Sequence, residues 1–172
     1  MHKLKNAIRI IVVMDAKKLF PLNTGVSQIR GIIAIIKDNK GAIDVSKLAE
    51  ETNDEIDDLF PLIDTCVLLK LCTVKEGVVK LTKSGRNIAT NNTREVMAKS
   101  LKKVEPFSSA LKEIEKAKRI DTADLSKALY TKGVMYNTDE ITNIELLKNL
   151  LLKWGVRSKI FSYDNGSDTW FR

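Results

Sequence analysis

Residues 53–86 read NDEIDDLFPLIDTCVLLKLCTVKEGVVKLTKSGR, and this stretch decides the fold. It predicts a helix over Glu55–Leu69, because an Asn-Asp pair that can cap a helix precedes an apolar pattern of helical spacing. Two short alternating segments follow, Leu71–Lys75 and Val78–Leu81, around a Glu-Gly turn. This is the pattern of a β-hairpin. The apolar residues of the helix that we expect to face inward are Ile56, Leu59, Phe60, Ile63 and Val67.

The residues on either side complete the unit. Val26–Asp38 places isoleucines at helical spacing, Ala42-Ile43 is an extended pair, and Asp44 can cap a short helix over Val45–Glu51. A short turn joins this helix to the next one, which is a helix-turn-helix arrangement. After the hairpin, Thr82 or Ser84 is expected to cap a helix that runs to about residue 90. This order predicts a winged helix.

A second run of elements repeats that order near the end of the chain, without detectable sequence identity. Helices are predicted over Phe107–Lys118 and over Ala123–Leu129, the second capped by Asp121 or Thr122. A long helix opened by Thr138 is expected to end at Gly155, and the run DNGS at residues 164–167 predicts a hairpin. The apolar face of the long helix is expected to hold Ile141, Ile144, Leu147, Leu151 and Trp154.

The expected fold is therefore mainly α with small β-hairpins (α+β), in tandem winged-helix units. Residues 1–18 form an N-terminal extension, with a strand at Asn6–Met14 that would pair with the wing or with a second subunit. Residues 19–92 make the first unit and residues 106–172 the second. Between them, residues 93–105 make a basic connector, with a helix over Arg94–Val104 capped by Thr93.

Several classes of function find no support in the sequence. The longest apolar runs are far shorter than the ~20 residues of a membrane helix, so we expect a cytoplasmic protein. There is no Gly-Lys pair for a phosphate-binding loop. His2 is the only histidine, so neither a catalytic triad nor a zinc site can be assembled. Cys66 and Cys72 are expected to be buried, reduced thiols. We expect no enzyme, no cofactor and no metal.

Charge is unevenly distributed along the chain, whose net charge is +7. Residues 44–65 hold eight acids and one base. A helix in the DNA major groove approaches phosphates on both sides, so acids on the second helix of the helix-turn-helix oppose DNA reading by it. We interpret them as a face for a protein partner, or for the chain's own basic connector. The candidate acidic residues are Asp54, Glu55, Asp57, Asp58 and Asp64.

Residues 70–119 are basic, with thirteen bases and five acids. They are either a solvated helix face or a surface for an anion, meaning nucleic acid or an acidic partner. The candidate contacts lie on the wing, the next helix and the connector: Lys75, Lys80, Lys83, Arg86, Arg94, Lys99, Lys102 and Lys103.

The chain also resembles a known family over about residues 19–172. The stretches that carry the resemblance are Phe20-Pro21-Leu22, the run EIDDLFPLI at residues 55–63, the junction VKLTKSGR at residues 79–86, and the runs LKWG and FSYD at residues 152–155 and 161–164. They are similar to the AAA-associated C-terminal domain, which follows the ATP-binding cassette in nitrate-, sulfonate- and taurine-type ABC transporter ATPases. The resemblance implies a non-catalytic domain tied to such an ATPase. No cassette precedes it here, so we expect a separate partner of the ATPase.

Two functions follow from these observations. The first is a non-enzymatic tandem winged-helix module that acts by protein–protein interaction, as a regulatory partner of an ABC-type ATPase. The alternative is a winged-helix transcription regulator, a homodimer that binds DNA through its basic wing and connector.

Overall fold

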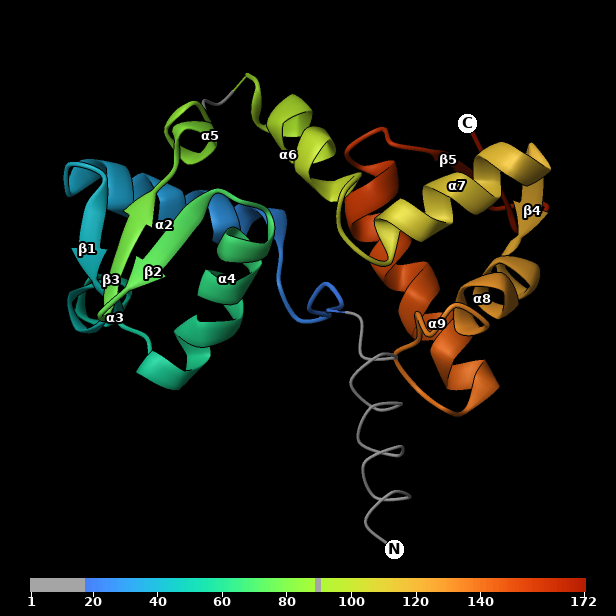
Figure 1. Cartoon of the computed structure of the whole chain (residues 1–172), viewed down its shortest axis with the longest axis horizontal. Helices are drawn as coiled ribbons and strands as arrows, with labels where there is room; N and C mark the ends of the chain where they lie inside the picture. Colours follow the sequence, from blue (N-terminus) through green and yellow to red (C-terminus); the bar gives the residue numbers. More distant parts are fainter. Residues whose placement is uncertain (1–17, 89–90) are drawn as a thin grey trace, which may run out of the picture.

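The computed structural model describes residues 18–88 and 91–172, so the strand expected at residues 6–14 lies outside the described residues. The N-terminal half, residues 18–88, is shown in blue to green in Figure 1. Its elements in order are α2 (Val26–Asp38), β1 (Ala42–Asp44), α3 (Val45–Thr52), α4 (Ile56–Leu68), β2 (Cys72–Lys75), β3 (Val78–Leu81) and α5 (Lys83–Arg86).

The rest of the described chain consists of residues 91–105, which include the connector, and the C-terminal half, residues 106–172. Figure 1 shows the two halves beside each other, with α6 above the gap between them. The elements in order are α6 (Thr93–Leu101), α7 (Phe107–Ala117), β4 (Arg119–Asp121), α8 (Thr122–Tyr130), α9 (Glu140–Leu150), the π-helical η1 (Leu151–Val156), β5 (Ser162–Asp164) and β6 (Thr169–Phe171).

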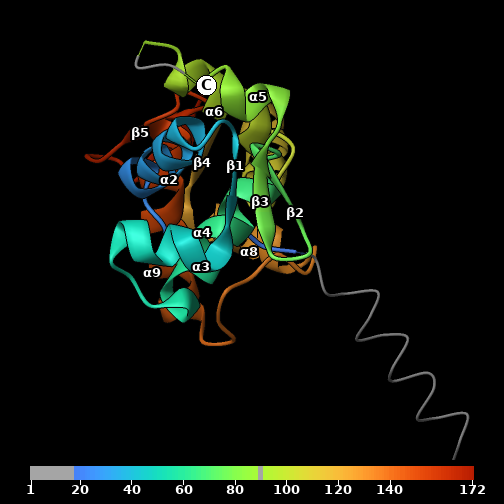
Figure 2. The ribbon, with the colours of Figure 1, turned by 90° about the vertical axis from the view of Figure 1, so that its left-hand side faces the viewer.

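Two small antiparallel sheets carry the described strands, and they have the same topology. The strand order is β1-β3-β2 in the first sheet and β4-β6-β5 in the second. Figure 2 shows the three strands of the first sheet side by side. Each sheet combines a hairpin with a third strand, β1 or β4, that precedes two helices. The strand β4 was not expected from the sequence. The α+β fold class is confirmed.

Three helices begin with an aspartate cap, and two of these caps, Asp44 and Asp121, were expected from the sequence. The carboxylates of Asp44, Asp121 and Asp139 each accept a hydrogen bond from a backbone N–H in the first turn of α3, α8 and α9. The third cap corrects the prediction that Thr138 opens the long helix. The cap predicted at Thr93 is also wrong, because Thr93 is already the first residue of α6.

The junction between β3 and α5 depends on Gly85. A Cβ atom built on Gly85 would lie 2.1 Å from the carbonyl oxygen of Leu71, so only glycine fits there. The Thr82 hydroxyl accepts a hydrogen bond from the Gly85 N–H and donates one to the Lys70 carbonyl. The junction at residues 79–86 thus holds the end of the hairpin against the residues just before β2. The helix that follows is shorter than expected, since α5 ends at Arg86.

The last long helix differs from its prediction in two respects. Gly155 does not end it, because the backbone continues through η1 to Val156. A Cβ on Gly155 would come within 2.3 Å of the Phe161 ring, so glycine is required for packing rather than for termination. At the other end, Ile141 is 71% exposed instead of lying on the apolar face.

Phe20 joins the two halves in one core. Its ring is fully buried and makes edge-to-face contacts with Phe107 and Trp154, at centroid distances of 5.3 and 4.7 Å. Its backbone N–H donates to the Glu105 carbonyl at 2.9 Å, and its own carbonyl accepts from the Tyr136 hydroxyl at 2.7 Å. The residue that leads into the first helix is therefore anchored in the other half of the molecule.

Candidate functional site

The predicted acidic residues all lie on α4 or on the loop before it, and all are exposed. None of them forms an ion pair with any residue of 18–88 or 91–172. No ion pair in the described structure therefore supports the alternative that these acids face the chain's own connector. The acids concerned are Asp54, Glu55, Asp57, Asp58 and Asp64.

Two large apolar side chains lie on α4 among these acids. Ile56 is 40% exposed and Phe60 is 48% exposed, so the expectation that both face inward is wrong. They are four residues apart and share one side of the helix, with Asp57 and Asp64 on the same turns. We call Ile56, Phe60, Asp57 and Asp64 the α4 face.

The reason for this orientation is the narrow buried stripe of α4. Leu59, Ile63 and Cys66 occupy it at the spacing of one helix face. Phe60 lies one residue, or about 100°, around the helix from Leu59, and the stripe is already filled without it. Leu59, Ile63 and Cys66 therefore form the contact of α4 with the core, and the Phe60 ring lies beside that contact and faces solvent.

Part of the acidity has a structural role. Asp57 and Asp58 lie in the first turn of α4, where negative charge is favourable because the N–H groups of a helix start are unpaired. Asp64 lies beyond the first turn and has no such role. The helix start therefore explains two of the acids, but neither Asp64 nor the exposed apolar pair.

The eight predicted basic contacts lie on the hairpin, on α5, on α6 and on the turn after α6. Lys75 and Lys80 are exposed on the hairpin, whereas the guanidinium of Arg86 lies over Gly41. Lys83 lies on α5, and Lys102 is exposed at the end of α6. The remaining three residues, Arg94, Lys99 and Lys103, each line one of two clefts beside α6.

Residues from distant parts of the chain complete these clefts. Lys99 and Lys103 line a hollow of about 480 Å³ together with Lys18 and Lys70. Arg94 lines another, of about 410 Å³, with two further arginines, Arg30 and Arg157. We name them the lysine cleft and the arginine cleft. The sequence places Lys99 and Lys103 near each other, but it carries no signal that Lys18 and Lys70 join them or that Arg30 and Arg157 join Arg94.

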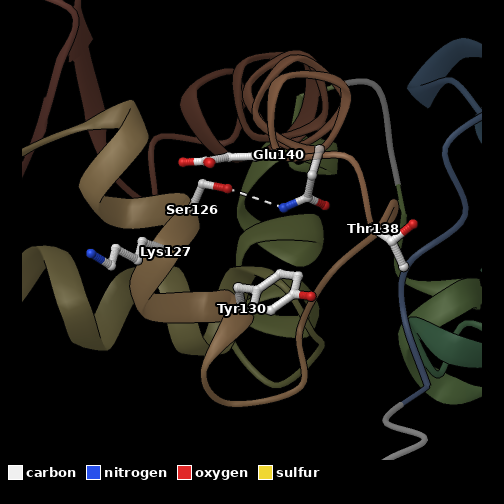
Figure 3. A pocket seen from close by; sticks show the side chains of 6 residues that line it. Ser126, Lys127, Tyr130, Thr138 and Glu140 are labelled. Atoms are coloured by element: carbon white, nitrogen blue, oxygen red, sulfur yellow. Dashed lines mark hydrogen bonds between the residues drawn. The ribbon is translucent and has the colours of Figure 1, made fainter.

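A third hollow, of about 340 Å³, lies between α8 and α9 (Figure 3). The buried Asn143 donates from Nδ2 to the Ser126 hydroxyl at 3.0 Å, and its Oδ1 accepts from the backbone N–H of Tyr136 and Asn137. The amide oxygen thus holds the loop before α9, and the amide nitrogen ties α9 to α8. The lining residues of the hollow are Ser126, Lys127, Tyr130, Thr138, Glu140 and Asn143.

The two cysteines are buried and reduced, as expected. A hydrogen bond with Cys72, together with burial, raises the pKa of the Cys66 thiol. A neutral, buried thiol is a poor nucleophile and a poor metal ligand. In the described part of the chain, no group of three or more histidine, cysteine, aspartate or glutamate side chains could hold a metal ion. No helix among the described residues is long and apolar enough to span a bilayer.

The two sheets of equal topology and their helices define the class, an α+β protein assembled from two similar arrangements. Comparison with protein families then identifies it more closely: residues 46–164 match the family described as the C-terminal AAA-associated domain. The match spans more than half of the chain, so the protein belongs to this family, as the resemblance in its sequence indicated. Neither a comparison with curated proteins nor one with solved structures gives a match.

Proposed function

We propose that this protein is a non-enzymatic module that binds another protein through the α4 face, and that its partner is an ABC-type ATPase. The single observation that carries the proposal is the exposure of Phe60 and Ile56 on an acidic helix. Exposed aromatic residues surrounded by polar groups are typical of protein-binding surfaces. Membership of an AAA-associated family supports an ATPase as the partner.

The shape of both halves supports the same proposal. We infer that each half is a winged helix, since each combines a hairpin with a third strand and a pair of helices. In a DNA-binding winged helix, α4 would be the helix that enters the major groove. The unpaired carboxylates of α4 would there face phosphates and raise the free energy of binding. A protein surface with basic residues around an apolar hollow is the better complement.

The energy available at the α4 face can be approximated from the exposure of Phe60. About half of a phenylalanine side chain, roughly 100 Å², would leave water on binding, which contributes about 2.5 kcal/mol at most. Ile56 adds a similar contact one turn away. Such an apolar pair is the size of a binding hot spot, and the surrounding acids would select partners of opposite charge.

A photo-crosslinking experiment in cells tests the proposal. Benzoylphenylalanine placed at position 60 should form an adduct that contains an ABC-type ATPase, identified by mass spectrometry. The matched control places it at Tyr130, an exposed aromatic residue on α8. We expect the Phe60→Asp variant to lose co-purification of the ATPase while Tyr130→Asp keeps it. Adducts without an ATPase, or equal loss in both variants, would contradict the proposal.

The second candidate function is DNA binding by a dimer that uses the wing and connector. Exposed lysines on the hairpin, Lys75 and Lys80, favour it, because neither forms an ion pair within the described residues. In that case the affinity for duplex DNA should fall steeply as the salt concentration rises. The double variant Lys80→Glu with Arg86→Glu should bind DNA more weakly than the unmodified chain at the same salt concentration. A gel shift at low salt with genomic fragments, together with light scattering for the dimer, checks both points. A monomer that shifts no fragment would exclude this function.

A further inference from the structure

The lysine cleft gathers positive charge from separate parts of the chain around one concavity. Lys18 precedes the first helix, Lys70 follows α4, and Lys99 and Lys103 belong to α6 and the turn after it. The same hollow is lined by Leu68, Leu69, Ser84, Ser100, Val104 and Glu105. It therefore lies where the end of α4, α5 and the connector meet.

The charge of the cleft is not balanced from within. None of its four lysines forms an ion pair with any residue in the described ranges. Among the described residues that line it, Glu105 is the one acid, and its carboxylate accepts hydrogen bonds from the N–H and the hydroxyl of Ser109, at 3.1 and 2.7 Å. Four ammonium groups thus stand against one carboxylate, so the described lining of the hollow carries an excess of positive charge.

Solvation alone is a weak explanation for this arrangement. Lysines on a convex surface spread apart in water, whereas these four surround one hollow, where like charges repel. An anion bound between them would remove that repulsion. Each ammonium can also donate hydrogen bonds to phosphate oxygens, and the hydroxyls of Ser84 and Ser100 add two further donors on the rim.

The size and walls of the cleft narrow the choice of anion. A volume of about 480 Å³ is within the range of small-molecule sites and far below what a nucleic-acid duplex occupies. Leu68, which is partly exposed, gives the wall an apolar part, whereas Leu69 and Val104 are buried behind the surface. The ligand that fits both features carries phosphate groups and an apolar portion.

We propose that the lysine cleft binds a small phosphate-bearing molecule of nucleotide size. The phosphates lie among the four ammonium groups, and the apolar portion rests against Leu68. Because the ligand contacts both the end of α4 and the connector, binding fixes the position of α6 against the N-terminal half. This site is independent of the α4 face, so its test does not depend on the proposed ATPase partner.

Isothermal titration of the full chain with inorganic triphosphate and with ATP, both without Mg²⁺, tests the site. The variant is Lys70→Gln with Lys99→Gln, which removes two charges of the cleft from two separate elements, the end of α4 and α6. The matched control is Lys75→Gln with Lys80→Gln, which removes the same charge from the hairpin. Circular dichroism verifies that both variants are folded.

We expect both ligands to bind the unmodified chain, and the cleft variant to bind each about tenfold more weakly. The control should stay within about twofold of the unmodified chain. We expect ATP to bind more tightly than triphosphate, because its nucleoside would contact the apolar part of the wall, and equal affinities would overturn that part of the proposal. Equal weakening in both variants would reduce the effect to net charge and overturn the proposal. Absence of binding of either ligand at millimolar concentration would also overturn it.

Discussion

Replacement of Phe20 by alanine should lower the free energy of unfolding by about 3–5 kcal/mol, as for other fully buried aromatic residues. The ring is fully buried and packs edge-to-face against Phe107 and Trp154, so its removal leaves a cavity and ends both contacts. The two hydrogen bonds of the Phe20 backbone are retained in the variant, since neither involves the ring. The loss is therefore due to packing alone.

Denaturant unfolding, followed by tryptophan fluorescence and by far-ultraviolet circular dichroism, measures this loss. Trp154 lies 4.7 Å from the Phe20 ring, so its emission should also change in the native state. The matched control is Phe60→Ala, the same substitution at an exposed phenylalanine, which should cost less than about 0.5 kcal/mol. A loss below about 1 kcal/mol for Phe20→Ala would refute the assignment of this ring to the shared core.

The same experiment tests whether Phe20 couples the two halves. In the unmodified chain the transitions seen by the two probes should coincide, since one core spans both halves. In Phe20→Ala they should separate, because Trp154 reports on the C-terminal half while circular dichroism reports on all helices. Coincident transitions in the variant would contradict the coupling role.

Three further outcomes are expected. Gly85→Ala should cost about 3 kcal/mol in unfolding free energy, because its Cβ would meet the Leu71 carbonyl oxygen; an unchanged midpoint would contradict this close approach. Ile141→Ala should change unfolding free energy by less than about 0.5 kcal/mol, and a loss above about 2 kcal/mol would show that the side chain is buried after all. A hydrogen bond from the Tyr163 hydroxyl, with further bonds, holds the pKa of Asp168 below its usual range. Its carboxylate therefore stabilises the fold above the unfolded-state pKa, near 3.9, and this contribution is lost as pH falls through the lower folded-state pKa. The stability difference between the unmodified chain and Asp168→Asn should shrink as pH falls from about 5 to about 2, and a constant difference would contradict the shift.

Local chemistry makes much of this fold readable from the sequence. Asp44 and Asp121 cap helices because a carboxylate after an extended residue reaches the free N–H groups of the next turn. Alternation around Glu76-Gly77 and around the DNGS run specifies both hairpins, since each needs only neighbours along the chain. The family resemblance rested on the same short-range features, above all the junction that ends in Gly85.

Contacts between distant residues decided what the sequence left open. Ile56, Phe60 and Ile141 are apolar and correctly spaced for burial, yet they are exposed because other side chains already fill the core beside them. Gly155 continues its helix because the Phe161 ring occupies the space of a side chain, which no local pattern reveals.

The candidate sites divide in the same way. The acids of the α4 face, Asp57 and Asp64, lie two turns apart on one helix, so helix periodicity alone places them on the same side. The exposed apolar residues of that face depend on which side of α4 packs against the core. The lysine cleft depends on the tertiary arrangement that brings Lys18 and Lys70 to Lys99 and Lys103. Helix periodicity sets the direction in which each side chain leaves the helix axis. Only tertiary packing sets which side of the helix meets the core and which side remains free to bind a partner.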